Sequence, residues 1–126
     1  MTATEVRLSI SEVAEATGLS PHTLRYYERA GLMLEPVGRA SSTHRRYNER
    51  DVTWVGFLTK LRSTAMPISQ VREYVELVKR GEVTTQDRLE LLMRHRIAVR
   101  AQLDEITRSL AAIDKKIDLY REICER

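Results

Sequence analysis

The last third of the chain most constrains what the protein can fold into. From Thr85 to Arg126 there is no glycine or proline, and apolar residues recur with the seven-residue period of a coiled coil. With Leu89 at position a, the a sites are Leu89, Arg96, Leu103, Leu110, Ile117 and Cys124, and the d sites are Leu92, Val99, Ile106, Ile113 and Tyr120. We call these positions the seam. At the helical rise per residue the seam spans roughly 50 Å.

A single helix with one apolar stripe needs a surface to pack against. The seam therefore predicts a dimerising coiled coil over residues 84–126, with an interface made of Leu89, Leu92, Val99, Leu103, Ile106, Leu110, Ile113, Ile117 and Tyr120. The alternative is that the helix folds back on the N-terminal part of the same chain, but that part is small for covering so long a seam. Arg96 is the charged seam residue, and it either fixes the register of the pair or extends its head to solvent.

The distribution of charge separates the two halves of the chain. Between Gly18 and Tyr47 five arginines stand against two acidic residues, whereas basic and acidic residues are nearly balanced from Ile68 onward. A basic first half is expected of a protein that meets a polyanion. The one cysteine, Cys124, excludes an intramolecular disulfide, and the sequence has neither a membrane span nor a signal peptide. We expect a soluble cytoplasmic protein that does not bind membranes.

Two short helices are predicted near the N-terminus. Ser11 is a suitable N-cap for a helix that ends at Gly18, and Ser20 begins a second helix that Gly31 closes. Pro21 would take the first helical position of this second helix, where its missing N–H costs nothing. Two short helices joined by a tight glycine-containing turn predict a helix-turn-helix, although structural hairpins share this pattern.

The segment that follows changes character. Residues 34–47 contain Pro36, Gly38 and a Ser/Ser/Thr cluster, which predict a loop or a short β-hairpin with basic residues. A third helix is expected after Asn48 or Asp51, up to the interruption at Pro67. Ser69 is then the predicted cap of a fourth helix that ends at Gly81.

The second predicted helix has two unlike sides. Leu24 and Tyr27 share one side, and Leu24 should face inward. The opposite side offers cations and hydrogen-bond donors without a carboxylate; it consists of His22, Arg25, Tyr26 and Arg29. Such a side suits phosphate oxygens and guanine edges, whereas an ordinary solvated face more often mixes signs. Thr23 lies near the end of the helix from which recognition helices reach bases.

These features together resemble one known family. The order SISEVAEATGLSPHTLRYYERAGLM, a basic loop ending in HRRYNERDV, a third helix with LTKLRSTAMPISQV, and a long heptad helix is similar to the MerR family of transcriptional regulators. The resemblance covers essentially the whole chain, and RYYE-x-x-GL with Arg45 and Tyr47 is its most specific part. The relationship implies a mainly α fold: a winged helix-turn-helix DNA-binding domain over residues 8–80, followed by the long dimerising helix.

The resemblance also implies a function and a set of DNA-binding residues. A homodimer joined through an antiparallel coiled coil would bind a palindromic promoter operator in double-stranded DNA, bend or untwist it, and act with RNA polymerase. The candidate DNA-binding residues, from the charge pattern and the resemblance together, are His22, Thr23, Arg25, Tyr26, Tyr27, Arg39, His44, Arg45, Arg46, Tyr47, Lys60 and Arg62. Tyr27 would pack its ring in the domain and offer its hydroxyl to a phosphate.

Two positions depart from the family pattern. Thr43 and His44 stand where the wing commonly has Gly-Tyr, and Ala65 stands where a glycine commonly precedes the residue aligned with Met66. The first departure affects the wing turn, and the second affects the junction between the third and fourth helices.

No effector is indicated by the sequence. Metal-sensing relatives use cysteines near the start of the dimerisation helix, but residues 83–88 have no Cys or His, so we expect no metal site and no cofactor. Cys124 is either a redox switch or a small hydrophobe in the seam. In an antiparallel pair the two Cys124 side chains would lie at opposite ends. The sequence shows neither a cysteine at the start of the third helix nor a ligand-binding domain after the long helix.

Two other classes of function remain as alternatives. The first half could dock a protein, which would make the chain a dimeric scaffold, and salt dependence would distinguish this from DNA binding. An enzyme is not indicated, because no nucleophile–base pair, glycine-rich phosphate loop or pair of carboxylates stands out.

Overall fold

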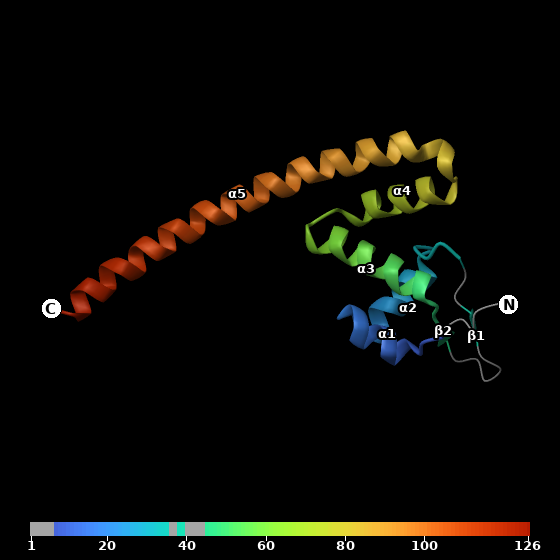
Figure 1. Cartoon of the computed structure of the whole chain (residues 1–126), viewed down its shortest axis with the longest axis horizontal. Helices are drawn as coiled ribbons and strands as arrows, with labels where there is room; N and C mark the ends of the chain where they lie inside the picture. Colours follow the sequence, from blue (N-terminus) through green and yellow to red (C-terminus); the bar gives the residue numbers. More distant parts are fainter. Residues whose placement is uncertain (1–6, 36–37, 40–44) are drawn as a thin grey trace. The chain divides into compact units, whose positions relative to one another are not determined.

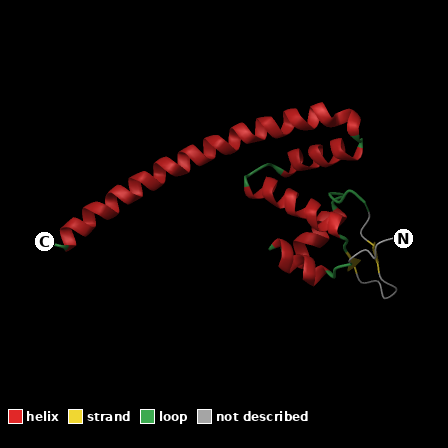
Figure 2. Ribbon diagram, in the orientation of Figure 1, coloured by secondary structure: helices red, strands yellow, loops and turns green. Residues whose placement is uncertain are grey.

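The computed structural model describes residues 7–35, 38–39 and 45–126, with the side chains of residues 38, 39, 45 and 46 left out. It divides into two compact units, residues 1–88 and 89–126. Helices dominate, as the sequence predicts (Figures 1 and 2). The elements are α1 (Ile10–Thr17), α2 (Pro21–Arg29), β1 (Gly38–Arg39), β2 (Arg45–Arg46), α3 (Glu49–Ser63), α4 (Ile68–Lys79), the 3-10 turn η1 (Glu82–Thr84) and α5 (Thr85–Cys124).

Helix α1 begins two residues earlier than the sequence pattern predicts. Its N-cap is Ser9, whose hydroxyl accepts from the Glu12 N–H at 3.2 Å, while the Glu12 carboxylate accepts from the Ser9 N–H at 3.0 Å. This reciprocal capping box satisfies two backbone donors that the first turn leaves open. The prediction of Ser11 as the cap is therefore wrong. The predicted end is confirmed, since Gly18 takes the left-handed conformation at φ 75°.

Helix α2 begins and ends as predicted. The Ser20 hydroxyl accepts from the Thr23 N–H at 3.1 Å, and Pro21 occupies the first turn. The helix closes through Gly31, which has φ 72° and follows the C-cap Ala30. Helix α1 contacts both α2 and α3, so α1 and α2 form a helix-turn-helix supported by a third helix (Figure 1).

Helices α3 and α4 complete the first unit. Asn48 caps α3 together with Asp51 in a second reciprocal box, as the sequence allowed. Helix α4 starts directly after Pro67 and has no side-chain cap, so Ser69 lies inside its first turn and the prediction of Ser69 as a cap is wrong. The buried apolar residues of this unit are Val13, Leu24, Tyr27, Leu32, Met33, Tyr47, Val55, Leu58, Leu61, Met66, Val71 and Val75.

The turn between α3 and α4 is strained at one residue. Ala65 has φ 68°, in the left-handed region where an L side chain costs about 1–2 kcal/mol. The turn is held there by two backbone bonds, from the Ala65 N–H to the Arg62 carbonyl at 3.0 Å and from the Met66 N–H to the Leu61 carbonyl at 3.0 Å. The departure from the family pattern at Ala65 therefore has a conformational consequence.

Replacing Ala65 with glycine should stabilise the first unit by about 0.5–1 kcal/mol. Glycine removes the free-energy cost of the left-handed conformation from the folded state. This gain is larger than the free energy by which the extra backbone entropy of glycine stabilises the unfolded chain. The stability change is measured as the difference in free energy of unfolding between Ala65→Gly and the parent protein, obtained by urea titration. The matched control is Ala16→Gly, at an exposed position inside α1, which should destabilise by roughly 0.5–1 kcal/mol. A lower free energy of unfolding for Ala65→Gly would contradict the strain.

Helix α5 is a single helix of 40 residues. It is entered through η1, where the buried Thr84 hydroxyl lies 2.5 Å from the Leu77 carbonyl and 2.9 Å from the Gly81 carbonyl. Every residue from 101 to 126 is exposed in the single chain, including the seam residues Leu103 and Ile106 at 60% and 64%. Within the described part of the chain, no helix has an apolar stretch that could cross a membrane.

Candidate nucleic-acid interface

The two sides of α2 are separated as the helical wheel predicts. Leu24 and Tyr27 are buried at 1% and 5% exposure, whereas Tyr26 is 36% exposed. His22 and Arg29 are also exposed, and Arg25 is half-buried. Packing of Leu24 and Tyr27 into the core thus fixes which side of α2 remains outside. That side displays the imidazole, guanidinium and phenol groups that the sequence assigns to DNA.

Thr23 lies at the N-terminal end of α2 and is held by its cap. Its hydroxyl is 3.1 Å from the Ser20 hydroxyl, and its N–H donates to the same oxygen. Thr23 is half-buried, so it retains some accessible surface at the end of the helix that reaches bases in helix-turn-helix proteins.

Tyr27 connects α2 to α3 through its hydroxyl. Burial raises the pKa of this hydroxyl above its ordinary value of 10.0, and the nearby Arg62 guanidinium and a hydrogen bond with Thr59 partly oppose that shift. The group is therefore protonated at neutral pH and can donate a hydrogen bond. Arg62 is oriented by a bond from its guanidinium to the Met66 carbonyl at 2.7 Å. Tyr27, Thr59 and Arg62 form what we call the Tyr27 cluster.

Removing the Tyr27 hydroxyl should weaken DNA binding at modest cost to the fold. The sequence alone predicts little loss of stability, but the bond with Thr59 sets the expected cost of Tyr27→Phe at about 0.5–1.5 kcal/mol. Tyr27→Ala, which also removes the packed ring, should cost about 3–5 kcal/mol. Urea unfolding and fluorescence anisotropy on labelled operator DNA separate the two effects. Unchanged affinity in Tyr27→Phe would leave Tyr27 as a core residue only.

The predicted wing is present as a two-stranded sheet. Strands β1 and β2 pair antiparallel, with Gly38 opposite Arg46 and Arg39 opposite Arg45. The hairpin backbone thus brings the three arginines to one short ribbon. Their side chains, and the whole of His44, lie outside the described residues, so their contacts with DNA remain predictions.

Tyr47 is a core residue. Its side chain is 0% exposed, and its backbone pairs with Leu8 through two bonds of 2.7 and 2.8 Å. A fully buried side chain cannot touch DNA in this conformation, so the assignment of Tyr47 as a DNA-contacting side chain is corrected. The reason is non-local: the segment before α1 pairs with the end of the hairpin at Tyr47, and the Tyr47 side chain belongs to the core of the first unit.

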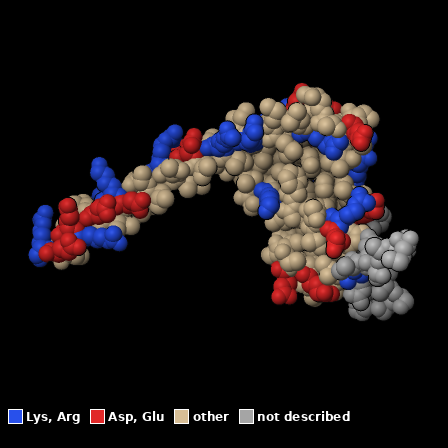
Figure 3. All heavy atoms as spheres, viewed as in Figure 1, with Lys and Arg blue, Asp and Glu red and all other residues tan. Residues whose placement is uncertain are grey.

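Lys60 and Arg62 lie in the last turn of α3, and both are exposed. Arg62 belongs to the Tyr27 cluster, so it is adjacent to α2. Along α5, by contrast, acidic side chains are interspersed with basic ones, particularly toward its C-terminal end (Figure 3). This mixture is typical of a solvated helix rather than a polyanion site.

The sequence patterns did not predict an aromatic cleft on the first unit. Trp54 and Tyr74 stack with ring centroids 5.8 Å apart, and Phe57 meets Tyr74 at 5.7 Å. The available signal was the i, i+3 spacing of Trp54 and Phe57, which lie off the buried face of α3. Only the packing of α3 against α4 brings Tyr74 to them.

No metal site is indicated by the geometry. Among the residues that the structure describes, no group of three or more His, Cys, Asp or Glu side chains is arranged to hold an ion.

These elements define a helix-turn-helix protein with a small β-wing and a long C-terminal helix. The MerR HTH family regulatory protein model matches residues 8–77, and a MerR DNA-binding model matches residues 52–116. The chain therefore belongs to the MerR family.

Two relatives have sequences similar to this one over most of the chain. An uncharacterized HTH-type transcriptional regulator of Haemophilus influenzae is 31% identical over 112 residues, which cover 89% of this chain and 82% of that protein. The HTH-type transcriptional regulator AdhR of Bacillus subtilis is 38% identical over 89 residues, which cover 71% of this chain and 63% of that protein.

Two solved structures share the fold. The crystal structure of HiNmlR, a MerR family regulator lacking the sensor domain and bound to promoter DNA, superposes with a TM-score of 0.86 at 29% identity, covering 92% of this chain and 87% of that one. The crystal structure of a putative MerR family transcriptional regulator from Listeria monocytogenes superposes with a TM-score of 0.80 at 36% identity. The superposition covers 90% of this chain and 85% of that one.

Proposed function

We propose that this protein is a transcriptional regulator that binds a palindromic promoter operator as a homodimer. The observation that carries the proposal is the exposed side of α2, where His22, Tyr26 and Arg29 are displayed while Leu24 and Tyr27 anchor the helix. Cations and donors on a helix that follows a tight turn suit the major groove and its flanking phosphates. The promoter-DNA complex of HiNmlR supports the same assignment.

The other DNA contacts would come from the hairpin and from the Tyr27 cluster. The hairpin with Arg39, Arg45 and Arg46 would lie beside α2 on the DNA backbone or in the minor groove. The Tyr27 cluster would add a protonated phenol and a fixed guanidinium for phosphate. Such contacts on both sides of a groove favour bending or untwisting of the operator.

Dimerisation would supply the two-fold symmetry that a palindrome requires. The seam is the proposed interface, since its residues from Leu103 to Tyr120 are exposed in the single chain and form one stripe. We assign an antiparallel coiled coil on the basis of the family resemblance. A regulator of this kind would work in the cytoplasm, with RNA polymerase at the same promoter.

Salt titration tests the proposal. Operator affinity, measured by fluorescence anisotropy, should fall linearly on a plot of log K against log salt concentration, because each neutralised phosphate releases counterions. Arg45→Ala should reduce the slope by about one unit for each phosphate that the dimer no longer neutralises. A dimeric scaffold that docks protein through its first half would bind the same DNA weakly and without sequence preference. That outcome would reject the regulator assignment.

A further inference from the structure

The C-terminal end of α2 is held by side chains from two other helices. The Lys79 ammonium donates to the Gly31 carbonyl at 2.9 Å, and the Trp54 indole N–H donates to the Leu32 carbonyl at 2.7 Å. Lys79 is the last residue of α4, whereas Trp54 belongs to α3. Two consecutive carbonyls that follow α2 are therefore bound by side chains from outside the helix-turn-helix.

The turn that ends α2 leaves these two carbonyls for side chains. Gly31 takes φ 72°, the Leu32 N–H donates to the Tyr27 carbonyl at 2.9 Å, and the Gly31 N–H donates to the Glu28 carbonyl at 3.3 Å. This pair of bonds across a left-handed glycine is a Schellman motif, which closes the last turn of a helix. The motif uses the N–H groups of Gly31 and Leu32, so their carbonyls are free to accept from α3 and α4.

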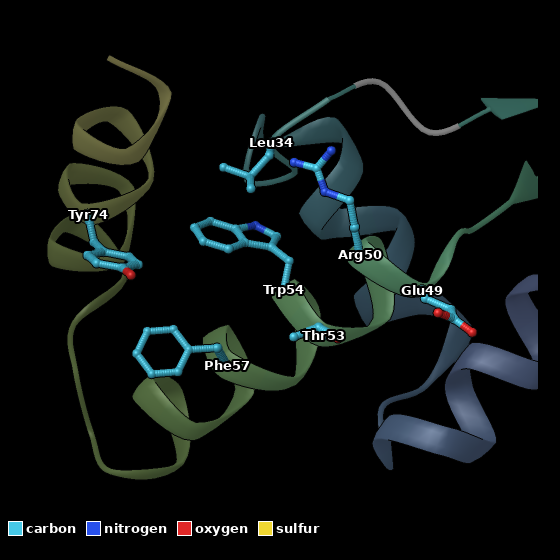
Figure 4. Close-up of a pocket in the computed structure, with 7 residues that line it drawn as sticks. All are labelled: Leu34, Glu49, Arg50, Thr53, Trp54, Phe57 and Tyr74. Atoms are coloured by element: carbon cyan, nitrogen blue, oxygen red, sulfur yellow. The ribbon is translucent and has the colours of Figure 1, made fainter. Parts of the chain in front are cut away.

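Trp54 is a rigid donor for the second of these carbonyls. Its ring stacks on Tyr74 with centroids 5.8 Å apart, and Figure 4 shows the indole among the Leu34 side chain and the Tyr74 and Phe57 rings. An indole packed among apolar groups has few rotamers open to it. The Leu32 carbonyl is thus held in one position relative to α3.

Lys79 extends from a segment that is also held in place. The Thr84 hydroxyl bonds to the Leu77 and Gly81 carbonyls, and the Arg88 guanidinium donates to the Gly81 carbonyl at 3.2 Å. Leu77 and Gly81 flank Lys79 in the chain, so these bonds fix the backbone on both sides of it. All of these residues belong to the first unit.

We propose that Lys79 is a positioning residue for operator recognition, because its ammonium fixes the C-terminal end of α2. Helix α2 has nine residues and is anchored at its other end by the Ser20 cap. Without the bond to Gly31 the helix can tilt about that cap, which changes how Tyr26 and Arg29 meet the DNA. The inference rests on the proposed function of α2 as the recognition helix, and it adds a residue that acts without touching DNA.

Two other roles for Lys79 predict different results. Its side chain is 33% exposed, so it could contact a phosphate, or it could be a surface lysine that does not affect DNA binding. The Glu76 carboxylate lies 3.9 Å away and is 69% exposed, and such a surface ion pair contributes little. Loss of a phosphate contact reduces the slope of log K against log salt concentration by about one unit for each phosphate. Loss of a positioning residue lowers the affinity at every salt concentration and leaves the slope unchanged.

Lys79→Met removes the donor and keeps an apolar stem of similar length. The probes are a duplex that carries the operator recovered from genomic fragments bound by the parent protein, and a scrambled duplex. In fluorescence anisotropy the operator affinity should fall about tenfold with the slope of the parent, while the affinity for the scrambled duplex stays within a factor of about two. The matched control is Arg80→Met, which removes one charge at the next, exposed residue and should bind both duplexes like the parent.

Lys79→Arg keeps a charged donor and should bind the operator within a factor of about two of the parent. Circular dichroism at the binding temperature checks that each variant is folded. A smaller salt slope in Lys79→Met, unchanged operator affinity in Lys79→Met, or equal losses in Lys79→Met and Lys79→Arg would each overturn the positioning role. If the parent bound the operator and the scrambled duplex alike, the regulator assignment itself would fail. Selective binding by the parent that Lys79→Met retains would reject only the role of Lys79.

Discussion

Replacing Arg25 with alanine should weaken operator binding by about 1–3 kcal/mol for each half-site, the range for removing one arginine from a base edge. Arg25 lies on the outer side of α2, half-buried beside the exposed Tyr26. Because both protomers of a dimer carry the change, the total loss can approach twice that value. Fluorescence anisotropy on the operator and on a scrambled duplex measures the loss and its sequence dependence.

The matched control for this change is Arg94→Ala. Arg94 is an exposed arginine of α5 at an f position, on the side of the helix opposite the seam, and it is not one of the predicted DNA-binding residues. The Arg94→Ala substitution removes the same charge as Arg25→Ala. It should leave the affinity for the operator within a factor of about two of the parent, since long-range surface electrostatics are screened at physiological salt. If Arg25→Ala and Arg94→Ala bound the operator equally well, α2 would not be the recognition helix.

The second large effect is expected at the middle of the seam, in Ile106→Asp. In the proposed antiparallel dimer with fully overlapping seams, Ile106 would lie near its own counterpart in the partner, so the variant would acquire two buried carboxylates close together. Losing the isoleucine side chain costs about 2–5 kcal/mol, and desolvating the charge adds to this. The dimer dissociation constant should rise by at least roughly 100-fold, which corresponds to about 2.8 kcal/mol.

Sedimentation velocity measures this dissociation, and the DNA-binding unit provides the internal check. Ile106 is 64% exposed in the single chain, so the variant should keep its folded first unit and helical signal. Operator binding should fall because only one half-site is engaged at a time. Lys115→Asp, at an f position, is the matched control and should stay dimeric. An intact dimer in Ile106→Asp would remove Ile106 from the interface.

Local chemistry explains what the sequence could predict about the fold. Gly18 and Gly31 mark helix ends because both take positive φ angles that other residues reach only with strain. The long α5 follows from the absence of Gly and Pro over its whole length. The separation of Leu24 from Tyr26 follows from helical periodicity, because these two side chains point in different directions from one helix.

The errors arose where several residues compete for one role or where distant segments meet. Ser9 and Ser11 are both plausible caps, and Glu12, three residues after Ser9, decides between them by closing the capping box. Tyr47 resembles a wing residue in sequence, but its backbone pairs with Leu8 and its side chain is fully buried in the core. Such pairing joins segments far apart in the chain, which no local pattern encodes.

In the candidate site, too, the features that depend on one helix could be predicted from the sequence, and those that depend on contacts between helices could not. The outer side of α2 could be predicted from spacing, since it depends on one helix only. The Tyr27 cluster could not, because Thr59 and Arg62 of α3 meet Tyr27 of α2 only when the first unit has folded. The aromatic cleft likewise depends on the meeting of α3 and α4.

Sequencing of the genomic DNA fragments that the purified protein retains at physiological salt tests the central claim most directly. We expect strong enrichment of one or a few promoter fragments that share a palindrome, with half-sites centred about one helical turn or a multiple of it apart. The same fragments should be lost from a parallel selection with Arg25→Ala and kept with Arg94→Ala. Retention of fragments without a shared palindrome, or with no enrichment over the input DNA, would contradict the assignment of this chain as an operator-binding dimer.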